Sequence, residues 1–325
     1  MWKIGDIEIN GNIVLGPMAG YTFYSYRKFM KSFGADVVIS EMVSDCGLKY
    51  GNEETISYLK SDGLEHPYGV QLFGNKAETI IEAMDIIKKQ RKEWQPDFID
   101  INLGCPVKKV TSAGSGSALL KDLDYLYDYM SKIVKASSWP VTAKIRLGWD
   151  DKSINYLDTI KILEKAGVKM IAVHARTTKQ LYAGKARIEL LENLQDKMNV
   201  PLVVSGDIFT LDDAINALKI SKAQAVMIAR GGVGNPTLIQ QIKAYFAKNE
   251  RLRDATILEQ KQYCLDLAKM VIEDKGEEKG MKIYRTIGPK FFEGFPNSKT
   301  IRSEIASKIS SYKDLVDILE KYIDN

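Results

Sequence analysis

The chain has 325 residues, more than one barrel-sized domain usually needs, which predicts a main domain and a smaller one. Apolar residues make up 45% and charged residues 27%, so we expect a sizeable core and not a disordered chain. The net charge of +4 excludes a protein that binds nucleic acid by charge alone, although it permits an RNA partner.

The three cysteines, Cys46, Cys105 and Cys264, are widely spaced. No CxxC pair exists, so neither a zinc site nor a thioredoxin-type motif is predicted, and we expect no metal. Three cysteines are too few for a disulfide framework, which favours a reducing, cytoplasmic setting. We expect neither a signal peptide nor a membrane span, because long apolar runs are lacking.

Strand-like and helix-like segments alternate along the first two thirds of the chain. The apolar runs are Ile13–Leu15, Asp36–Ile39, Tyr68–Leu72, Phe98–Asn102, Val141–Ile145, Met170–His174, Leu202–Val204 and Ala225–Ala229. The amphipathic segments between them include Ala77–Lys92, Leu123–Ser137, Ile154–Ala166 and Thr210–Lys219. Alternation predicts a parallel α/β sheet, and a count of eight strands favours a (β/α)8 TIM barrel over an open doubly wound sheet.

The pattern changes near Asn235-Pro236, beyond which no strand-like run occurs. The later residues are predicted to form helices over Ile257–Ile272, Met281–Phe292 and Tyr312–Tyr322. We place the boundary near 240–245, so that residues 1–242 form the barrel and residues 243–325 form a smaller C-terminal all-α domain.

Active sites of such barrels lie at the carboxyl ends of the strands, so the residues that follow each run are candidates. After the first run, Gly16–Gly20 combines a proline with small residues that let a flat ligand approach the backbone. An ordinary tight turn without a ligand has the same residue pattern. Gln71 is a polar residue inside an apolar strand, where a ring ligand or a structural partner would satisfy its amide.

The fourth run ends with Asn102, and Cys105 follows at the start of the loop. An unperturbed thiol has a pKa of about 8.5 and stays mostly protonated near neutral pH, so it can donate a proton. A lone cysteine is usually only a small apolar residue, but its place among the strand ends favours a chemical role.

Further candidates follow the last four strands. Lys144 lies within the fifth strand, where a charge requires an anion or a ring acceptor, and His174 ends the sixth. Ser205-Gly206-Asp207 and Ala229-Arg230-Gly231-Gly232 follow the seventh and eighth strands, which is the usual phosphate site of these barrels. They indicate a phosphorylated ligand such as FMN, the alternative being turns that bind nothing.

Together these residues resemble the tRNA-dihydrouridine synthase family. The matching elements, in order, are Pro17-Met18-Ala19-Gly20, Ser40-Glu41-Met42, Gln71, Asn102–Pro106, Lys108-Lys109-Val110, Gly116-Ser117, Lys144–Arg146, His174–Thr177, Gly206-Asp207 and Arg230-Gly231. The Asn-x-Gly-Cys-Pro element followed by Lys-Val is the most specific of them. The tandem Lys108-Lys109-Val110 and the helical Lys279-Gly280 are most similar to the bacterial B-type branch.

The resemblance implies an enzyme that uses FMN, reduced by NADPH, to reduce the C5=C6 bond of uridine in tRNA, with the D-loop region as the expected target. Hydride would pass from flavin N5 to C6 of the uracil while Cys105 protonates C5. The implied cofactor-binding residues are Pro17, Met18, Ala19, Gln71, Lys144, His174, Ser205, Gly206, Asp207, Ala229 and Arg230. The implied substrate-binding residues are Asn102, Lys108, Lys109, Arg176, Lys279, Lys282 and Arg285.

This sequence departs from the family pattern at two places. Ser205 stands where the family often has asparagine. Arg285 is followed by Thr286 and Ile287 instead of the Arg-Lys-His run of relatives, which removes basic character from a helix expected to contact RNA.

Other functions remain open on the residues alone. One is a flavin barrel that acts on a free pyrimidine, as dihydroorotate dehydrogenases do; another is a tRNA-binding protein without chemistry; a third is a flavin-free, phosphate-binding aldolase in which Lys144 forms a Schiff base. We expect a monomer. Cys46 and Cys264 have no expected role beyond structure.

Overall fold

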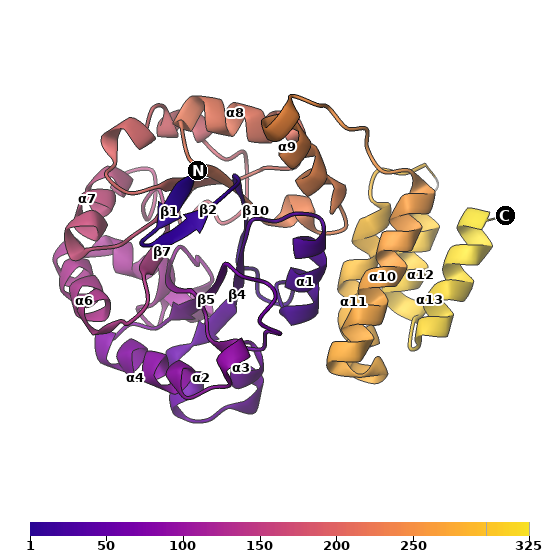
Figure 1. Cartoon of the computed structure of the whole chain (residues 1–325), viewed down its shortest axis with the longest axis horizontal. Coiled ribbons are helices and arrows are strands. Elements are labelled where there is room, and N and C mark those ends of the chain that lie inside the picture. The colour runs from indigo at the N-terminus through magenta and orange to yellow at the C-terminus, as the bar shows by residue number, and fades with distance from the viewer. Residues whose placement is uncertain (297, 325) are drawn as a thin grey trace.

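Eight parallel strands close into a barrel in the computed structural model, which describes residues 1–296 and 298–324 (Figure 1). Around the barrel the strand order is β10-β3-β4-β5-β6-β7-β8-β9. The strands are β3 Ile13–Leu15, β4 Val37–Ser44, β5 Tyr68–Phe73, β6 Phe98–Leu103, β7 Val141–Arg146, β8 Ile171–His174, β9 Leu202–Ser205 and β10 Ala225–Ile228. Nearly every strand residue is buried, as expected for parallel strands covered on both faces. The predicted (β/α)8 barrel is confirmed.

Helices surround the barrel, and the longer ones among them bury an apolar face. They are α1 Tyr24–Ser32, α2 Asp45–Lys49, α3 Glu53–Ser57, α4 Ala77–Lys88, α5 Lys108–Thr111, α6 Leu123–Ala136, α7 Tyr156–Ala166, α8 Leu211–Ser221 and α9 Thr237–Lys248. In α8, the Thr210 hydroxyl accepts from the N–H of Asp213, and the Asp213 side chain binds back to the N-cap N–H. Such capping stabilises a helix by about 1 kcal/mol.

A short N-terminal hairpin covers one end of the barrel, and the sequence analysis did not predict it. Strand β1 (Trp2–Ile4) pairs antiparallel with β2 (Ile7–Ile9). Trp2, Ile4 and Ile9 pack in one cluster with residues of the barrel strands, among them Val14 and Phe98. Because this end is filled by side chains, a ligand enters from the opposite end, where the strands have their carboxyl termini.

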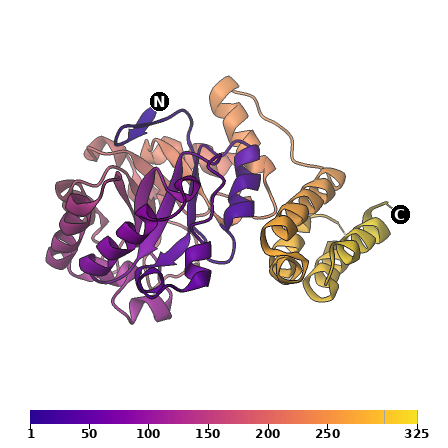
Figure 2. The ribbon, with the colours of Figure 1, turned by 60° about the horizontal axis from the view of Figure 1, so that its bottom comes forward.

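The C-terminal helices form a separate body beside α1 (Figures 1 and 2). They are α10 Ile257–Lys275, α11 Glu277–Ile287, α12 Ser298–Lys308 and α13 Tyr312–Leu319. The helix predicted over Met281–Phe292 is instead α11 followed by a 3₁₀ turn from Gly288, where Pro289 interrupts the α-helical hydrogen bonding. Helix α12 was missed, because its apolar positions are sparse.

The predicted boundary at residue 242 lies inside α9, which packs on the barrel. We propose that the two domains divide instead in the extended segment 249–256, which has no regular structure and precedes α10.

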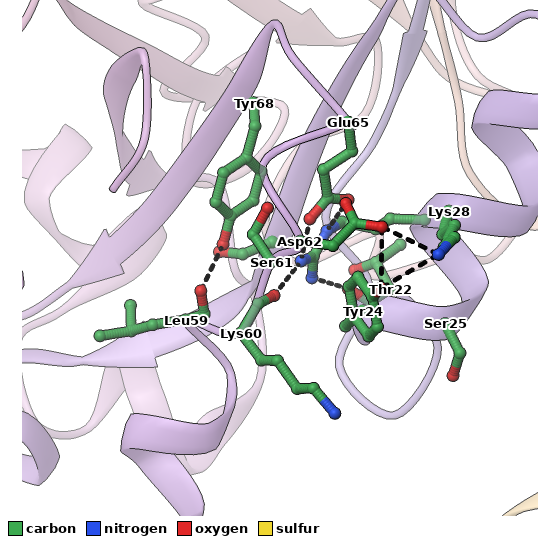
Figure 3. A network of polar contacts seen from close by, with 12 residues as sticks. Thr22, Tyr24, Ser25, Lys28, Leu59, Lys60, Ser61, Asp62, Glu65 and Tyr68 are labelled. Carbon is green, nitrogen blue, oxygen red and sulfur yellow. Dashed lines mark hydrogen bonds and ion pairs between the residues drawn. The ribbon is translucent and has the colours of Figure 1, made fainter. Parts of the chain in front are cut away.

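Asp274, near the end of α10, joins the helical domain to the barrel. Its carboxylate is 1% exposed and accepts from the Ser25 hydroxyl at 3.2 Å and from Lys60 Nζ at 2.5 Å. The loop that carries Lys60 is itself held against α1, since Tyr24 and Lys28 both bind Asp62 at 2.9 Å (Figure 3). This loop therefore sets where the two domains meet.

Behind that contact lies a buried ion pair between Arg27 of α1 and Glu65. The guanidinium binds both carboxylate oxygens, at 3.0 and 2.8 Å, and also donates to the carbonyls of Thr22 and Lys60. It stacks over the ring of Tyr68, 4.7 Å from its centroid. Because all these partners are satisfied, the buried charge is compensated and the loop is rigidly attached.

Candidate active site

A cavity of about 430 Å³ opens at the carboxyl ends of the strands, within the usual size range of ligand sites. Of the predicted site residues, those lining it are Pro17, Met18, Ala19, Asn102, Cys105, Lys109, Lys144, His174, Ser205, Gly206, Asp207, Ala229 and Arg230. Residues from nearly all eight strand ends thus converge on one space, as the barrel topology requires.

Cys105 lies in the wall of this cavity with 9% of its surface exposed. Burial raises the pKa of its thiol, and the nearby N–H of Val107 and the positive charges of Arg146 and Lys144 only partly oppose this. The group is therefore protonated at neutral pH and can act as an acid, but it is a poor nucleophile there.

The loop that carries Cys105 is clamped from two sides. The Cys105 carbonyl accepts from both the N–H (3.1 Å) and the hydroxyl (2.8 Å) of Ser117. The guanidinium of Arg146, 2% exposed, donates to the carbonyl of Gly104 at 2.8 Å and to those of Thr177 and Leu181, also at 2.8 Å. Arg146 thus joins the loop after β6 to the loop after β8 and fixes the thiol between them.

Lys144 and His174 place one positive and one neutral group in the same wall. Burial, together with the neighbouring Arg146, lowers the pKa of Lys144 to about 8, so the ammonium is charged below that pH. Burial and the adjacent positive charges lower the pKa of His174 well below its usual value. The imidazole is neutral, and its Nε2 lies 3.4 Å from an Nη1 donor of Arg176, which assigns Nε2 as the acceptor.

Arg176 does not reach the surface, contrary to the prediction that it grips substrate phosphates. It is 1% exposed, and its guanidinium binds Asp207 through two hydrogen bonds of 2.9 and 2.6 Å and also the carbonyl of Gly184. An arginine paired in this way has no free donor edge for RNA. Its position directly after β8 suggested the mouth, but the backbone turns and directs the side chain inward.

Asp207 binds the guanidinium groups of both Arg176 and Arg230 at the predicted phosphate end of the cavity. Burial raises its pKa, but the hydrogen bonds from Arg176 and from the N–H of Ala186 outweigh this and leave the pKa lowered, so the carboxylate is charged. It also binds Arg230 Nη2 at 3.1 Å. Because a carboxylate repels a phosphate, the side chain of Asp207 positions Arg230, and anion binding falls to Arg230 and the backbone.

The loops after β9 and β10 approach each other so closely that only glycine fits at residue 231. A Cβ atom there would lie 1.9 Å from the carbonyl oxygen of Ile208. Gly206, with φ +127°, adopts a conformation that favours glycine, and its Cβ would lie 2.7 Å from Ala186. This pair of glycines forms a backbone-lined end of the cavity.

Gln71 does not line the cavity. It is fully buried beneath it, where Nε2 donates to Asp100 at 2.6 Å and Oε1 accepts from Asn102 at 2.7 Å. The structure thus gives its amide protein partners, the alternative that the sequence left open. Asn102 does line the cavity, and one N–H of its amide has no protein partner among the residues described.

The predicted RNA-contacting residues lie outside the cavity, apart from Asn102 and Lys109. Lys108 is exposed on α5. On α11, Lys279 and Lys282 are exposed, Lys282 pairing with Glu278 at 2.6 Å, whereas Arg285 Nε donates to the carbonyl of Ile309 at 2.8 Å.

Two aromatic residues that the sequence analysis missed stand at the cavity rim. Tyr182 is 52% exposed and Phe209 44% exposed, and both line the cavity. The guanidinium of Arg230 lies 5.0 Å from the ring centroid of Tyr182 and 5.6 Å from that of Phe209. A signal existed, because exposed aromatic side chains in loops often mark binding sites, but Tyr182 lies eight residues beyond its strand.

Within residues 1–296 and 298–324, no group of three or more His, Cys, Asp or Glu residues is placed to hold a metal ion. Over the same described ranges, no helix is long and apolar enough to cross a bilayer.

Comparison with known proteins gives one consistent match. A family model described as Dihydrouridine synthase (Dus) matches residues 14–325. A probable tRNA-dihydrouridine synthase of Rickettsia bellii is 34% identical over 327 residues, covering 100% of this chain and 97% of the relative. The tRNA-dihydrouridine synthase B of Pseudomonas aeruginosa is 31% identical over 302 residues, covering 93% and 90%.

Solved structures share the barrel at low sequence identity. A 6-hydroxypseudooxynicotine amine oxidase from Pseudomonas geniculata matches with a TM-score of 0.55 at 12% identity, over 78% of this chain and 52% of the other. A 2-naphthoyl-CoA reductase matches with a TM-score of 0.54 at 11% identity, over 75% and 51%. These likenesses show the fold.

Proposed function

The chain belongs to the dihydrouridine synthase family, and we propose that it uses FMN, with NADPH as the reductant, to reduce the C5=C6 bond of uridine in tRNA. It is an oxidoreductase that acts on uridine in tRNA. The choice of FMN and NADPH, and the roles of individual residues, are our proposals.

The observation that carries this proposal is a nearly buried thiol in the wall of a cavity at the barrel mouth. Reducing an alkene conjugated to a carbonyl requires a hydride on one carbon and a proton on the other. Cys105 is buried enough to remain protonated, and the clamps from Ser117 and Arg146 keep it in place. We assign it as the catalytic acid for C5 of the uracil.

The cavity fits a flavin mononucleotide in size, charge and backbone shape. The glycine-lined end at Gly206 and Gly231 suits a phosphate, and Arg230 adds positive charge there. Lys144 and the neutral His174 offer a cation and a hydrogen-bonding ring for the isoalloxazine, beside the Pro17–Ala19 turn. When bound, a reduced flavin supplies the hydride. Ser205 and Ala229 line the same end of the cavity, where Asp207 positions Arg230.

Uridine must leave the RNA stack to enter the cavity, which costs a few kcal/mol. Lys108 and Lys109 at the mouth, with Lys279 and Lys282 on α11, are exposed cations that would bind phosphates and offset this cost. Asn102 offers its free N–H to the base. We propose that the helical domain, docked through Asp274, presents the tRNA to the barrel.

The pKa of Lys144 predicts how flavin binding depends on pH. Since burial lowers this pKa to about 8, the ammonium charge is present at pH 7 and largely lost at pH 9. We expect the FMN dissociation constant to rise by about tenfold between these values, as linkage to one proton predicts. Lys144→Met should bind FMN more weakly at pH 7 but show a flat profile. Equal slopes in the two proteins, measured by quenching of FMN fluorescence, would exclude Lys144 from the flavin site.

The activity itself is tested by mapping dihydrouridine in tRNA by mass. Unmodified tRNA is incubated with the purified chain, FMN and NADPH, and free uridine, UMP and orotate are tested in parallel. Our proposal expects a 2 Da gain at defined uridines of tRNA, which is the mass of two hydrogen atoms, and no turnover of the free compounds. Turnover of a free pyrimidine with unchanged tRNA would favour a dihydroorotate dehydrogenase-like enzyme instead.

A further inference from the structure

A chain of buried hydrogen bonds runs beneath the cavity from Thr142 to the backbone of Cys105. The Thr142 hydroxyl donates to Asp100 Oδ1 at 2.6 Å, and Gln71 Nε2 donates to Asp100 Oδ2 at 2.6 Å. Asn102 Nδ2 then donates to Gln71 Oε1 at 2.7 Å, and Asn102 Oδ1 accepts from the N–H of Cys105 at 2.8 Å. We call this series the Thr142–Cys105 chain.

The barrel register explains why these side chains meet. Gln71 on β5 is paired with Asp100 on β6, and Asp100 is paired with Thr142 on β7. Asn102 follows Asp100 by two residues, so it points to the same face of β6. Thr142, Asp100 and Gln71 are fully buried, and Asn102 is 5% exposed, so no solvent competes for their hydrogen bonds.

Both ends of the Thr142–Cys105 chain dictate the same direction of donation. At one end, the N–H groups of Cys105 and Gly104 can only donate, so they require Asn102 to present its oxygen to them. Its NH₂ group is then directed to Gln71, which must present its own oxygen and turn its NH₂ group to Asp100. At the other end, an ionised Asp100 can only accept, which satisfies that NH₂ group.

Thr142 is the adaptable member, since a hydroxyl both donates and accepts. It serves an ionised Asp100 as a donor and a protonated Asp100 as an acceptor, without any change at Gln71. Burial raises the pKa of Asp100, although Thr142, Gln71 and the charge of Lys144 oppose this. The direction of donation at Gln71 therefore survives a change in the protonation state of Asp100.

Resting on the function proposed above, we propose that Asp100 and Thr142 are positioning residues, which fix the amide orientation of Asn102 and thereby the Cys105 turn. Neither residue lines the cavity, and their hydrogen bonds reach Cys105 only through Gln71 and Asn102. If the amide of Asn102 were reversed, its NH₂ group would face the N–H of Cys105, two donors in a buried site. The turn would then lose the acceptor for the N–H groups of Gly104 and Cys105 and be held only by Ser117 and Arg146, so the thiol would be placed less exactly. The free N–H that Asn102 offers to the base would also be displaced.

Four variants separate the direction of donation from mere packing. Asp100→Asn keeps the shape, and Thr142 can rotate to accept from the new NH₂ group, so the direction at Gln71 is preserved. Thr142→Val removes the hydroxyl but leaves Asp100 as an acceptor for Gln71. In the double variant D100N/T142V the new NH₂ group has no acceptor at residue 142. It either stays unsatisfied or turns toward Gln71, which reverses the direction of donation along the Thr142–Cys105 chain. D100N/T142S, which retains the hydroxyl, is the matched control.

The readout is the rate at which iodoacetamide alkylates each cysteine of the full chain, resolved by peptide mass spectrometry. Cys105 reports the turn, the exposed Cys46 reports reagent strength, and the fully buried Cys264 in the helical domain reports unfolding. This measurement requires neither cofactor nor tRNA, so it distinguishes failure of this inference from failure of the proposed function. Kinetics on tRNA should show a parallel fall in kcat in the double variant.

In the single variants and in D100N/T142S, we expect the alkylation rate of Cys105 to stay within about threefold of the parent rate. In D100N/T142V, the rise in this rate should exceed the product of the two single-variant rises by about tenfold, as loss of one buried hydrogen bond predicts. Cys46 and Cys264 rates should not change. The inference is overturned if Asp100→Asn alone gives the full rise, because charge would then hold the turn, or if the two effects simply multiply. If Cys264 of the double variant reacts as fast as Cys46, the double variant is unfolded. Gln71→Met then serves as the test instead, because it interrupts the Thr142–Cys105 chain of hydrogen bonds, and it must give the same rise in the alkylation rate of Cys105.

Discussion

Replacing Cys105 with alanine is expected to lower the rate of uridine reduction by about 10²- to 10⁴-fold, the range that a general acid contributes. The side chain is 9% exposed and its pKa is raised by burial, so a proton is available at neutral pH that alanine cannot supply. FMN retention and tRNA binding should stay within about threefold of the parent, because the hydrogen bonds of residue 105 to Asn102 and Ser117 use its backbone atoms, which alanine keeps.

Single-turnover reduction of tRNA by the pre-reduced enzyme measures this directly, since it excludes the reaction with NADPH. Cys46→Ala is the matched control, because Cys46 is exposed on α2 and does not line the cavity. Undiminished single-turnover reduction by Cys105→Ala would refute the role of the thiol as the acid. A matching loss in Cys46→Ala would indicate a general effect of losing a thiol.

Gly231→Ala is expected to weaken FMN binding by about 100-fold or more, and to lower the free energy of unfolding by about 1–3 kcal/mol, as overpacking does. Its Cβ would lie 1.9 Å from the carbonyl oxygen of Ile208, which is backbone and cannot rotate away. The loops after β9 and β10 must therefore separate, and the backbone N–H groups at the phosphate end move with them.

Equilibrium titration with FMN and urea unfolding, monitored on the same samples, separate the two effects. The control is Gly280→Ala on α11, where the nearest atom outside the helix to the new Cβ would be the carbonyl oxygen of Val271 at 3.3 Å, a tight contact without the overlap at residue 231, and alanine favours the helix. If Gly231→Ala unfolds more easily but binds FMN as the parent does, the glycine-lined end is not the phosphate site.

The sequence predicted the barrel because its eight buried strands are short, apolar and regularly spaced, and each strand end carries a polar residue at a readable position. Cys105, Lys144 and His174 could be assigned to one cavity on this basis alone, since parallel strands in a closed barrel must end together. The N-terminal hairpin escaped prediction because three-residue strands are too short to show alternation.

Side-chain direction was the part that the sequence could not predict. Arg176 follows β8 directly and carries a charge, which favours an exposed phosphate ligand, yet Asp207 lies 31 residues away in the sequence and binds it inside. Gln71 illustrates the same limit, because its partner Asp100 became recognisable only from the register of β5 with β6. Such pairings depend on contacts between distant strands, which a local pattern does not contain.

The seam between β3 and β10 has a consequence for the order in which the protein matures on the ribosome. Val226 pairs with Ile13, so the first barrel strand, which pairs with β4 on its other side, gains its second neighbour only when nearly the whole barrel has been synthesised. The cavity spans this seam, with Pro17–Ala19 on one side and Ala229-Arg230 on the other. A nascent chain therefore completes this cavity only when β10 and the loop after it have been made, and only afterwards do α9 and the helices that begin with α10 emerge, the latter to dock on α1.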